Sequence, residues 1–137
     1  MIPIEEYRTE NREIKDICEI ISLAVNDFSM MQNHITDELL HRFFDRVNQH
    51  LRHEDKAIYG DLLAKHTSQA NKYADFFLEN TRELKRINKQ FKKRWSKITH
   101  TQEQHQEFTD DINSIFKLTC DRIEFEEKKI FPMFIQD

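Results

Sequence analysis

The chain has 137 residues, a length that is enough to bury the core of one ordinary domain. Of these residues 38% are hydrophobic and 34% are charged. Its formal net charge of −4 excludes a general electrostatic attraction to nucleic acid or to anionic lipid. One glycine and two prolines leave few tight-turn signals, so long helices are favoured, and no apolar run approaches the roughly 20 residues that span a bilayer.

The first predicted helix covers about residues 4–26 and directly follows Pro3. Steps of roughly 100° per residue place its core side chains on one face. These side chains are Tyr7, Ile14, Cys18, Ile21 and Val25. Glu10 and Asn11 lie on either flank of this apolar face, so either of them could point inward.

Asp27 and Ser29 are favourable N-cap residues, and they predict a second helix over about residues 29–63. Gly60 lies near the end of this helix and is expected to loosen its last turns. One stripe of the helix carries Leu40, Phe43, Val47, His50, Glu54 and Ile58.

The third predicted helix covers about residues 67–95, and its stripe consists of Tyr73, Phe76, Asn80, Leu84, Ile87 and Phe91. The fourth covers about residues 102–131, begins at a capping box of Thr101 and Gln104, and ends before Pro132. Its stripe consists of Phe108, Ile112, Ile115, Thr119, Arg122, Glu126 and Ile130.

The connections between these four helices are short, which favours antiparallel neighbours. The expected fold is therefore all-α, a single domain over residues 1–137 that forms an antiparallel up-down-up-down four-helix bundle.

Charged residues interrupt the apolar stripes at similar depth on two of the helices. His50 and Glu54 are four residues apart, as are Arg122 and Glu126, so each pair stacks on one side of its helix. Asn80 lies in the third stripe. Because buried charges must be paired or bound to a metal, we expect these side chains to converge in the centre of the bundle.

The order and spacing of these residues resemble the hemerythrin-like, or HHE cation-binding, family. That family has a Glu-His pair on its first and third helices, His-x-x-x-Glu on its second, and His-Ile-x-x-Glu-Glu before an aromatic-Pro ending on its fourth. The matching elements here are Glu10-Asn11, His50-x-x-x-Glu54, Glu79-Asn80 and Arg122-Ile123-x-x-Glu126-Glu127 followed by IFP.

The resemblance covers nearly the whole chain and implies a hemerythrin-like four-helix bundle. Typical members hold a non-haem di-iron centre and serve in oxygen binding, iron handling or sensing. Here Asn11, Asn80 and Arg122 stand at three positions where the family has histidine, whereas His50, Glu54 and Glu126 match the pattern.

The first interpretation is a degenerate metal centre without a cofactor. Arginine has no lone pair for a metal, and the charges of Arg122 and a protonated His50 cancel those of Glu54 and Glu126. The internal polar network would then comprise His50, Glu54, Asn80, Arg122, Glu126 and Asn11. We expect a structural, regulatory or partner-binding module rather than an enzyme, since no nucleophile-base arrangement is present.

The alternative is a metal-binding protein that handles iron or another metal, or senses oxygen or redox state. His50, Glu54 and Glu126 would bind a di-iron or mononuclear centre, joined by Glu10 and Glu79 after a small helix rotation. This alternative requires Arg122 to swing out of the centre.

The remaining histidines are expected to be solvated or half-exposed, although His34 and His41 could bind a surface metal adventitiously. The basic run from Lys85 to Arg94 is interpreted as an outer helix face near a C-terminus, not as a nucleic-acid site. A homodimer face or protein-partner groove would follow if the outward aromatics Phe44, Phe77 or Phe131 were exposed.

The N-terminal segment MIPIEEYRTE lacks the basic and then apolar order of a signal peptide. Cysteine is rare, with Cys18 and Cys120 the two in the chain. This pattern favours free thiols in a reducing compartment, so we expect a cytoplasmic protein without a membrane partner, in which Cys18 is a small buried hydrophobic residue.

Overall fold

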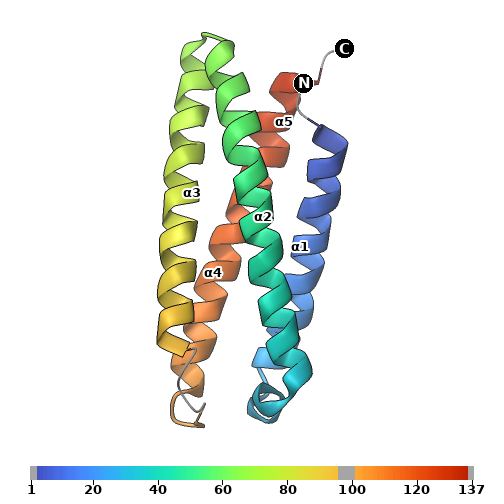
Figure 1. Ribbon diagram of the computed structural model, residues 1–137, viewed down its shortest axis with the longest axis vertical. Coiled ribbons are helices and arrows are strands. Elements are labelled where there is room, and N and C mark those ends of the chain that lie inside the picture. Colours follow the sequence, from blue (N-terminus) through green and yellow to red (C-terminus); the bar gives the residue numbers. More distant parts are fainter. Residues whose placement is uncertain (1–2, 96–100, 136–137) are drawn as a thin grey trace.

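A computed structural model describes residues 3–95 and 101–135 and shows an elongated bundle of long helices (Figure 1). The helices are α1 (Ile4–Val25), α2 (His34–Ala64), α3 (Ser68–Trp95) and α4 (His105–Phe125). A 3₁₀ helix, η1 (Phe28–Gln32), joins α1 to α2. None of the described helices combines the length and the hydropathy needed to cross a bilayer.

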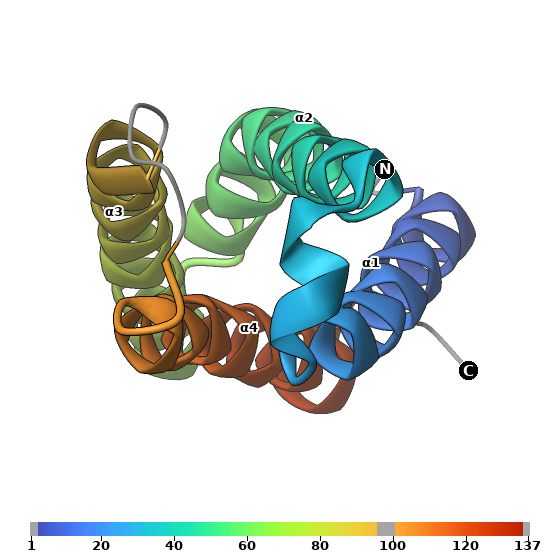
Figure 2. The same ribbon diagram turned by 90° about the horizontal axis from the view of Figure 1, so that it is seen from below.

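The four long helices alternate in direction, and both α2 and α4 lie beside α1 and beside α3 (Figure 2). The start of α1 and the end of the chain's last helix lie at the same end of the bundle (Figure 1). No strand occurs among the residues that are described. The predicted all-α four-helix architecture is confirmed.

The start of the second helix differs from the prediction. The Asp27 side chain accepts a hydrogen bond of 3.0 Å from the Ser29 backbone nitrogen, but it caps η1. The N-cap of α2 is Asn33, whose side chain accepts from the nitrogen of Ile35 at 2.9 Å. Both caps satisfy backbone N–H groups that a helix start leaves without a partner. The expected loosening at Gly60 is absent from the secondary structure, because α2 continues to Ala64.

The fourth helix also differs at both ends. It begins at His105. The Thr101 hydroxyl accepts a bond of 3.4 Å from the Gln104 nitrogen, but the Gln104 side-chain oxygen has no partner among the described residues, so only half of the expected capping box is formed. At the other end, α4 passes into a π-helix, η2 (Glu126–Ile130), and then into the short α5 (Phe131–Phe134). Pro132 lies in the first turn of α5, where its missing N–H is tolerated, so it does not end the helical segment.

The predicted faces of the first, second and fourth helices are correct, but the third face is rotated. The buried residues of α3 are Ala70, Ala74, Phe77, Thr81, Leu84, Asn88 and Phe91. Phe76, which was expected inside, is 48% exposed. Phe44, Phe77 and Phe131 were expected to point outward, but all three are buried, so they form no dimer face or partner groove.

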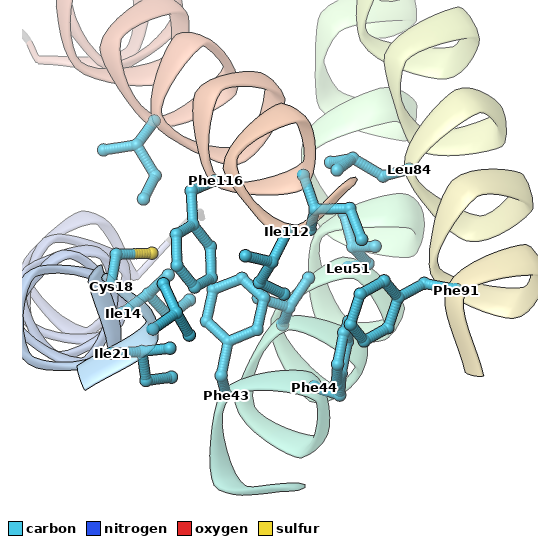
Figure 3. Packing of buried hydrophobic residues seen from close by; sticks show 14 of the residues in the cluster. Ile14, Cys18, Ile21, Phe43, Phe44, Leu51, Leu84, Phe91, Ile112 and Phe116 are labelled. Carbon is cyan, nitrogen blue, oxygen red and sulfur yellow. The ribbon is translucent and has the colours of Figure 1, made fainter. Parts of the chain in front are cut away.

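The core is divided into two apolar clusters along the bundle. The first contains Phe43, Phe44, Phe91, Phe108 and Phe116 packed with aliphatic residues of all four helices (Figure 3). The second is built around Tyr7, Ile58, Leu62, Phe77, Ile130 and Phe131. The helices α1, α2 and α3 contribute buried residues to both clusters, whereas the second cluster takes Ile130 and Phe131 from the helical segment after α4.

Candidate functional site

Buried polar side chains occupy the level between the two apolar clusters. They are Asn11 from α1, His50 and Glu54 from α2, Thr81 from α3, Arg122 from α4 and Glu126 from η2. None is more than 4% exposed. On α1 and α3 these positions fall between residues of the second and the first apolar cluster, so burial of the clusters also buries this polar layer.

Arg122 is the hydrogen-bonding centre of the polar layer. Its Nε donates to Glu126 Oε2 at 3.0 Å, and its Nη2 donates to Glu54 Oε2 at 3.2 Å. Its Nη1 donates to Asn80 Oδ1 at 3.1 Å and to Thr81 Oγ1 at 2.5 Å. The planar fork of the guanidinium thus connects α2, α3 and η2, and charge-assisted bonds of this kind are the stronger hydrogen bonds of proteins.

His50 binds acidic side chains through both of its ring nitrogens. Nδ1 lies 2.5 Å from Glu10 Oε2. Nε2 contacts Glu54 Oε1 and lies 3.3 Å from Glu126 Oε1. Both nitrogens therefore face carboxyl oxygens, one at the edge of the layer and two at its centre. The edge-to-face ring of Tyr7, 5.7 Å away between centroids, packs against the imidazole.

The helix-1 pair reaches the polar layer in two different ways. Asn11 is fully buried, and its Nδ2 donates to Glu126 Oε1 at 3.1 Å. Glu10 is about one-third exposed and reaches inward only as far as His50. Both residues therefore contribute, one to the centre and one at its edge.

The pKa values of Glu54 and Glu10 are shifted in opposite directions. Desolvation raises the pKa of Glu54 well above its ordinary value, and the neighbouring charge and hydrogen bond of Glu126 raise it further against the opposing effect of Arg122. At the edge, the hydrogen bond from His50 lowers the pKa of Glu10 against a smaller opposing effect of burial. The two shifts have opposite signs because Glu54 is enclosed beside a second carboxyl group, whereas Glu10 is bound to His50 at the edge of the layer.

The carboxyl groups of Glu54 and Glu126 each direct one oxygen toward Arg122 and the other toward His50. The Oε2 atoms of Glu54 and Glu126 bind Arg122, whereas their Oε1 atoms face His50. One ligand atom from each of His50, Glu54 and Glu126 lies within 4.8 Å of the other two, so the group could hold a metal ion. One imidazole and two carboxylates form a plausible donor set for a divalent transition metal.

The same residues do not fit a two-metal centre. A guanidinium without a lone pair binds the Oε2 atoms that a second ion would need. The amide oxygen of Asn80 already accepts from Arg122, while the buried Asn11 Oδ1 has no partner among the described residues but is a poor substitute for imidazole. The donor set is thus sufficient for one ion and insufficient for two.

Glu79 is the predicted ligand that the structure leaves outside this cluster. Its side chain is exposed on α3, so the small rotation that would bring it inward is not observed. Asn80, which was expected in the network, does bind Arg122, and Thr81 and Phe77 are two further α3 residues that contact the guanidinium. Thr81 and Phe77 were missed, although their spacing of four residues and the position of Leu84 three residues later would fit an inward face.

The other features noted in the sequence lie away from the polar layer. His34 and His41 are largely exposed and lie 3.5 Å from Glu38 and Asp37, respectively. His53 and His66 are also exposed and His105 is half-buried, while His100 lies outside the described residues. All six basic side chains between Lys85 and Arg94 are exposed, as expected for an outer helix face.

Comparison with protein families gives one match, to the model described as the hemerythrin HHE cation binding domain, over residues 2–134. No curated protein and no solved structure matches the chain significantly. The family description concerns cation binding, and the candidate ligands in this chain are His50, Glu54 and Glu126.

Proposed function

Because this chain belongs to the hemerythrin HHE cation-binding domain family, we propose that it is a member in which an internal ionic network replaces the two-metal centre. The observation that carries the proposal is Arg122, which is 3% exposed and binds Glu54 and Glu126 simultaneously. Its guanidinium acts as a fixed cation at the place where a second metal ion would be bound. The domain would serve as a structural, regulatory or partner-binding module in the cytoplasm.

Electrostatics favours this proposal over a metal pair. Metal binding requires a neutral His50 and an ionised Glu54. In that state the carboxylates of Glu10, Glu54 and Glu126 and the guanidinium of Arg122 sum to −2. One divalent ion would bring the buried cluster to zero, whereas two would leave it at +2. At about 4 Å, each repulsive pair of unit charges costs about 4 kcal/mol even at an effective dielectric constant near 20.

The enclosure of the polar layer supports a role other than catalysis. Arg122, Glu54 and Glu126 are almost completely buried, so a substrate has little access to them. A cavity of about 270 Å³ lies between α3 and α4, lined by residues such as Phe91 and Asp111, and none of its lining residues belongs to the polar layer. A regulatory role would therefore depend on surfaces of the bundle rather than on chemistry at its centre.

A second candidate function is binding of a single cation, for metal handling or for oxygen or redox sensing. The observation that favours it is the convergence of His50 Nε2, Glu54 Oε1 and Glu126 Oε1 on the side of the carboxyl groups that faces away from Arg122. In this case His50 and the two glutamates would hold the ion while Arg122 remains in its observed position. Iron and manganese both suit a donor set of imidazole and carboxylate.

Elemental analysis of protein purified from cells grown with added iron or manganese tests the two candidates. A matched control, the His34→Ala/His41→Ala double variant, removes the exposed histidines that could bind metal adventitiously. The ionic network predicts less than a tenth of a metal equivalent per chain in this control. One equivalent that disappears in Glu54→Ala would instead support the single-cation site, and two iron equivalents with an oxo-bridge absorption band would refute both candidates.

A further inference from the structure

The two cysteines, 102 positions apart in the sequence, meet where α1 packs against α4. Cys18 is 5% exposed, and its sulfur points toward Phe116 of α4 (Figure 3). Cys120 lies one turn after Phe116 and is half-buried. Cys120 is on the same side of α4 as Phe116, which the Cys18 sulfur faces, and the two thiols affect each other's pKa. One member of the pair is therefore accessible and the other is enclosed.

The surroundings activate the accessible member of this pair. The hydrogen bond with Cys18 and the positive charge of Lys15 lower the pKa of Cys120 to about 7, against an opposing effect of burial. The same hydrogen bond, together with burial, raises the pKa of Cys18. A large fraction of Cys120 is therefore thiolate at neutral pH, which is the nucleophilic form of cysteine.

We propose that Cys18 and Cys120 are a redox-active pair that forms a reversible disulfide between α1 and α4 on reaction with hydrogen peroxide. This inference is independent of the function proposed for the polar layer. It rests on the position of both thiols where α1 packs against α4 and on their unequal exposure, and the mutual effect of the two thiols supports it.

The reaction has two steps. The Cys120 thiolate attacks one peroxide oxygen, the O–O bond breaks, and the departing hydroxide takes up a proton to form water, which leaves Cys120 as a sulfenic acid. The Cys18 sulfur then attacks the Cys120 sulfur, the S–O bond breaks, and the leaving hydroxide departs as a second water with the proton from Cys18. Two thiols and one peroxide thus give one disulfide and two waters, and an external dithiol reverses the oxidation.

The pair lies on the two helices that hold one side of the polar layer. Cys120 precedes Arg122 by two residues, and Cys18 follows Asn11 by seven, which is about two helical turns. Asn11 itself binds Glu126, which follows the end of α4. A disulfide would add a covalent link between helices that the polar layer already connects by hydrogen bonds.

The test is intact-mass analysis of the full chain after reduction, treatment with a small excess of hydrogen peroxide, and alkylation of the remaining thiols. The parent chain is expected to lose the mass of two hydrogen atoms, remain monomeric and resist alkylation. Cys120→Ser should not lose this mass. Cys18→Ser should accumulate a sulfenic acid on Cys120 that a 1,3-dione reagent captures.

Alkylation rates measured against pH give an independent test that needs no peroxide. The rate at Cys120 should rise through pH of about 7, and Lys15→Met should shift this rise to higher pH. Lys72→Met removes an exposed lysine of α3 and should have no effect. Disulfides only between chains, persistence of both free thiols in peroxide, or a Cys120 profile that rises only near the ordinary cysteine pKa would each overturn the proposal.

Discussion

The guanidinium carbon of Arg122 lies 4.0 Å from the centroid of the Phe77 ring, which is itself 1% exposed. A cation above an aromatic face is attracted by the electron density of the ring, and the attraction is larger where water is excluded. The contact also leaves the edges of the guanidinium free to donate to Glu54 and Glu126. Phe77 therefore helps to hold Arg122 in the one orientation that serves both carboxyl groups.

We expect Arg122→Ala to lower the free energy of unfolding by about 3–5 kcal/mol, because it leaves Glu54 and Glu126 buried without their cation. Arg94→Ala is the matched control. Arg94 is about half-exposed, and its pairs with Glu107 and Asp111 should contribute no more than about 1 kcal/mol. Urea denaturation of the three proteins measures the difference, and equal losses in the two variants would contradict a central role for Arg122.

Arg122→His should increase the metal content of the protein. The substitution removes the fixed cation and supplies an imidazole close to Glu54 and Glu126, so that ligands replace a repulsive charge. Arg122→Lys, which retains a positive charge and supplies no imidazole, is the control and should bind no more metal than the parent. Elemental analysis after growth with iron checks this expectation, and equal metal content in the two variants would argue against it.

The protonation of Glu54 predicts a fall in stability as the pH rises. Its pKa is raised in the folded state, so folding favours the protonated form. This stabilisation is complete below the ordinary glutamate pKa of about 4.3 and is lost as the pH rises toward the folded-state value. Unfolding free energies measured at a series of pH values should show the fall in the parent and not in Glu54→Gln.

The pKa of Glu10 is shifted in the opposite direction from that of Glu54, so its pH dependence should also be opposite. Its pKa is lowered by the hydrogen bond with His50, so its contribution is present above the ordinary glutamate pKa and is lost as the pH falls through the folded-state value. Glu10→Gln should therefore abolish the decrease in unfolding free energy as the pH falls. It should keep the decrease that Glu54 causes as the pH rises. If both variants gave the same pH profile, the assignment of opposite shifts to the two residues would be wrong.

Asn88→Leu should increase the free energy of unfolding by about 1–2 kcal/mol. Asn88 is 3% exposed, and neither polar atom of its amide has a partner among the described residues, so an apolar side chain of similar size removes a desolvation cost. Thr81→Val is the informative comparison, since the Thr81 hydroxyl accepts from Arg122 and its loss should destabilise the protein. Thermal unfolding distinguishes the two, and destabilisation by Asn88→Leu would contradict the explanation.

The four-helix architecture and the centre of the polar layer could be predicted, because the spacing of residues along each helix determines which of them share a face. His50 and Glu54, and likewise Arg122 and Glu126, are four residues apart within otherwise apolar stripes, so burial of each stripe buries its pair. The sequence did not predict which of Glu10 and Asn11 would be buried at the centre and which would lie at the edge. Both flank the apolar face of α1, and their partners come from helices distant in sequence.

The face of α3 was wrong because large apolar side chains dominate a sequence pattern. Tyr73 and Phe76 suggested one stripe, whereas the buried face includes the small residues Ala70, Ala74 and Thr81. Small side chains carry little hydrophobic signal, but they are buried on this face of α3 and permit close approach of a neighbouring helix. Because of this error Thr81 was missed and Phe77 was expected to point outward, whereas Asn80, at the edge of the buried face, does bind Arg122 as expected.

The passage from α4 into the π-helix also had no signal strong enough to predict. Pro132 predicts the end of the helix because proline cannot donate the regular helical hydrogen bond. The chain instead widens one turn at Glu126–Ile130 and places Pro132 just after it, in the first turn of α5. Both Ile130 and Phe131, adjacent in sequence, are consequently buried at 0% exposure.

A positive charge carried by an arginine side chain is synthesised with the polypeptide and cannot dissociate from it. Arg122 is therefore available to Glu54 and Glu126 from the moment their helices first assemble, at any concentration of nutrient metal and in the presence of any chelator. A bundle held together in this way should reach its native state as readily in a starved cell as in a replete one.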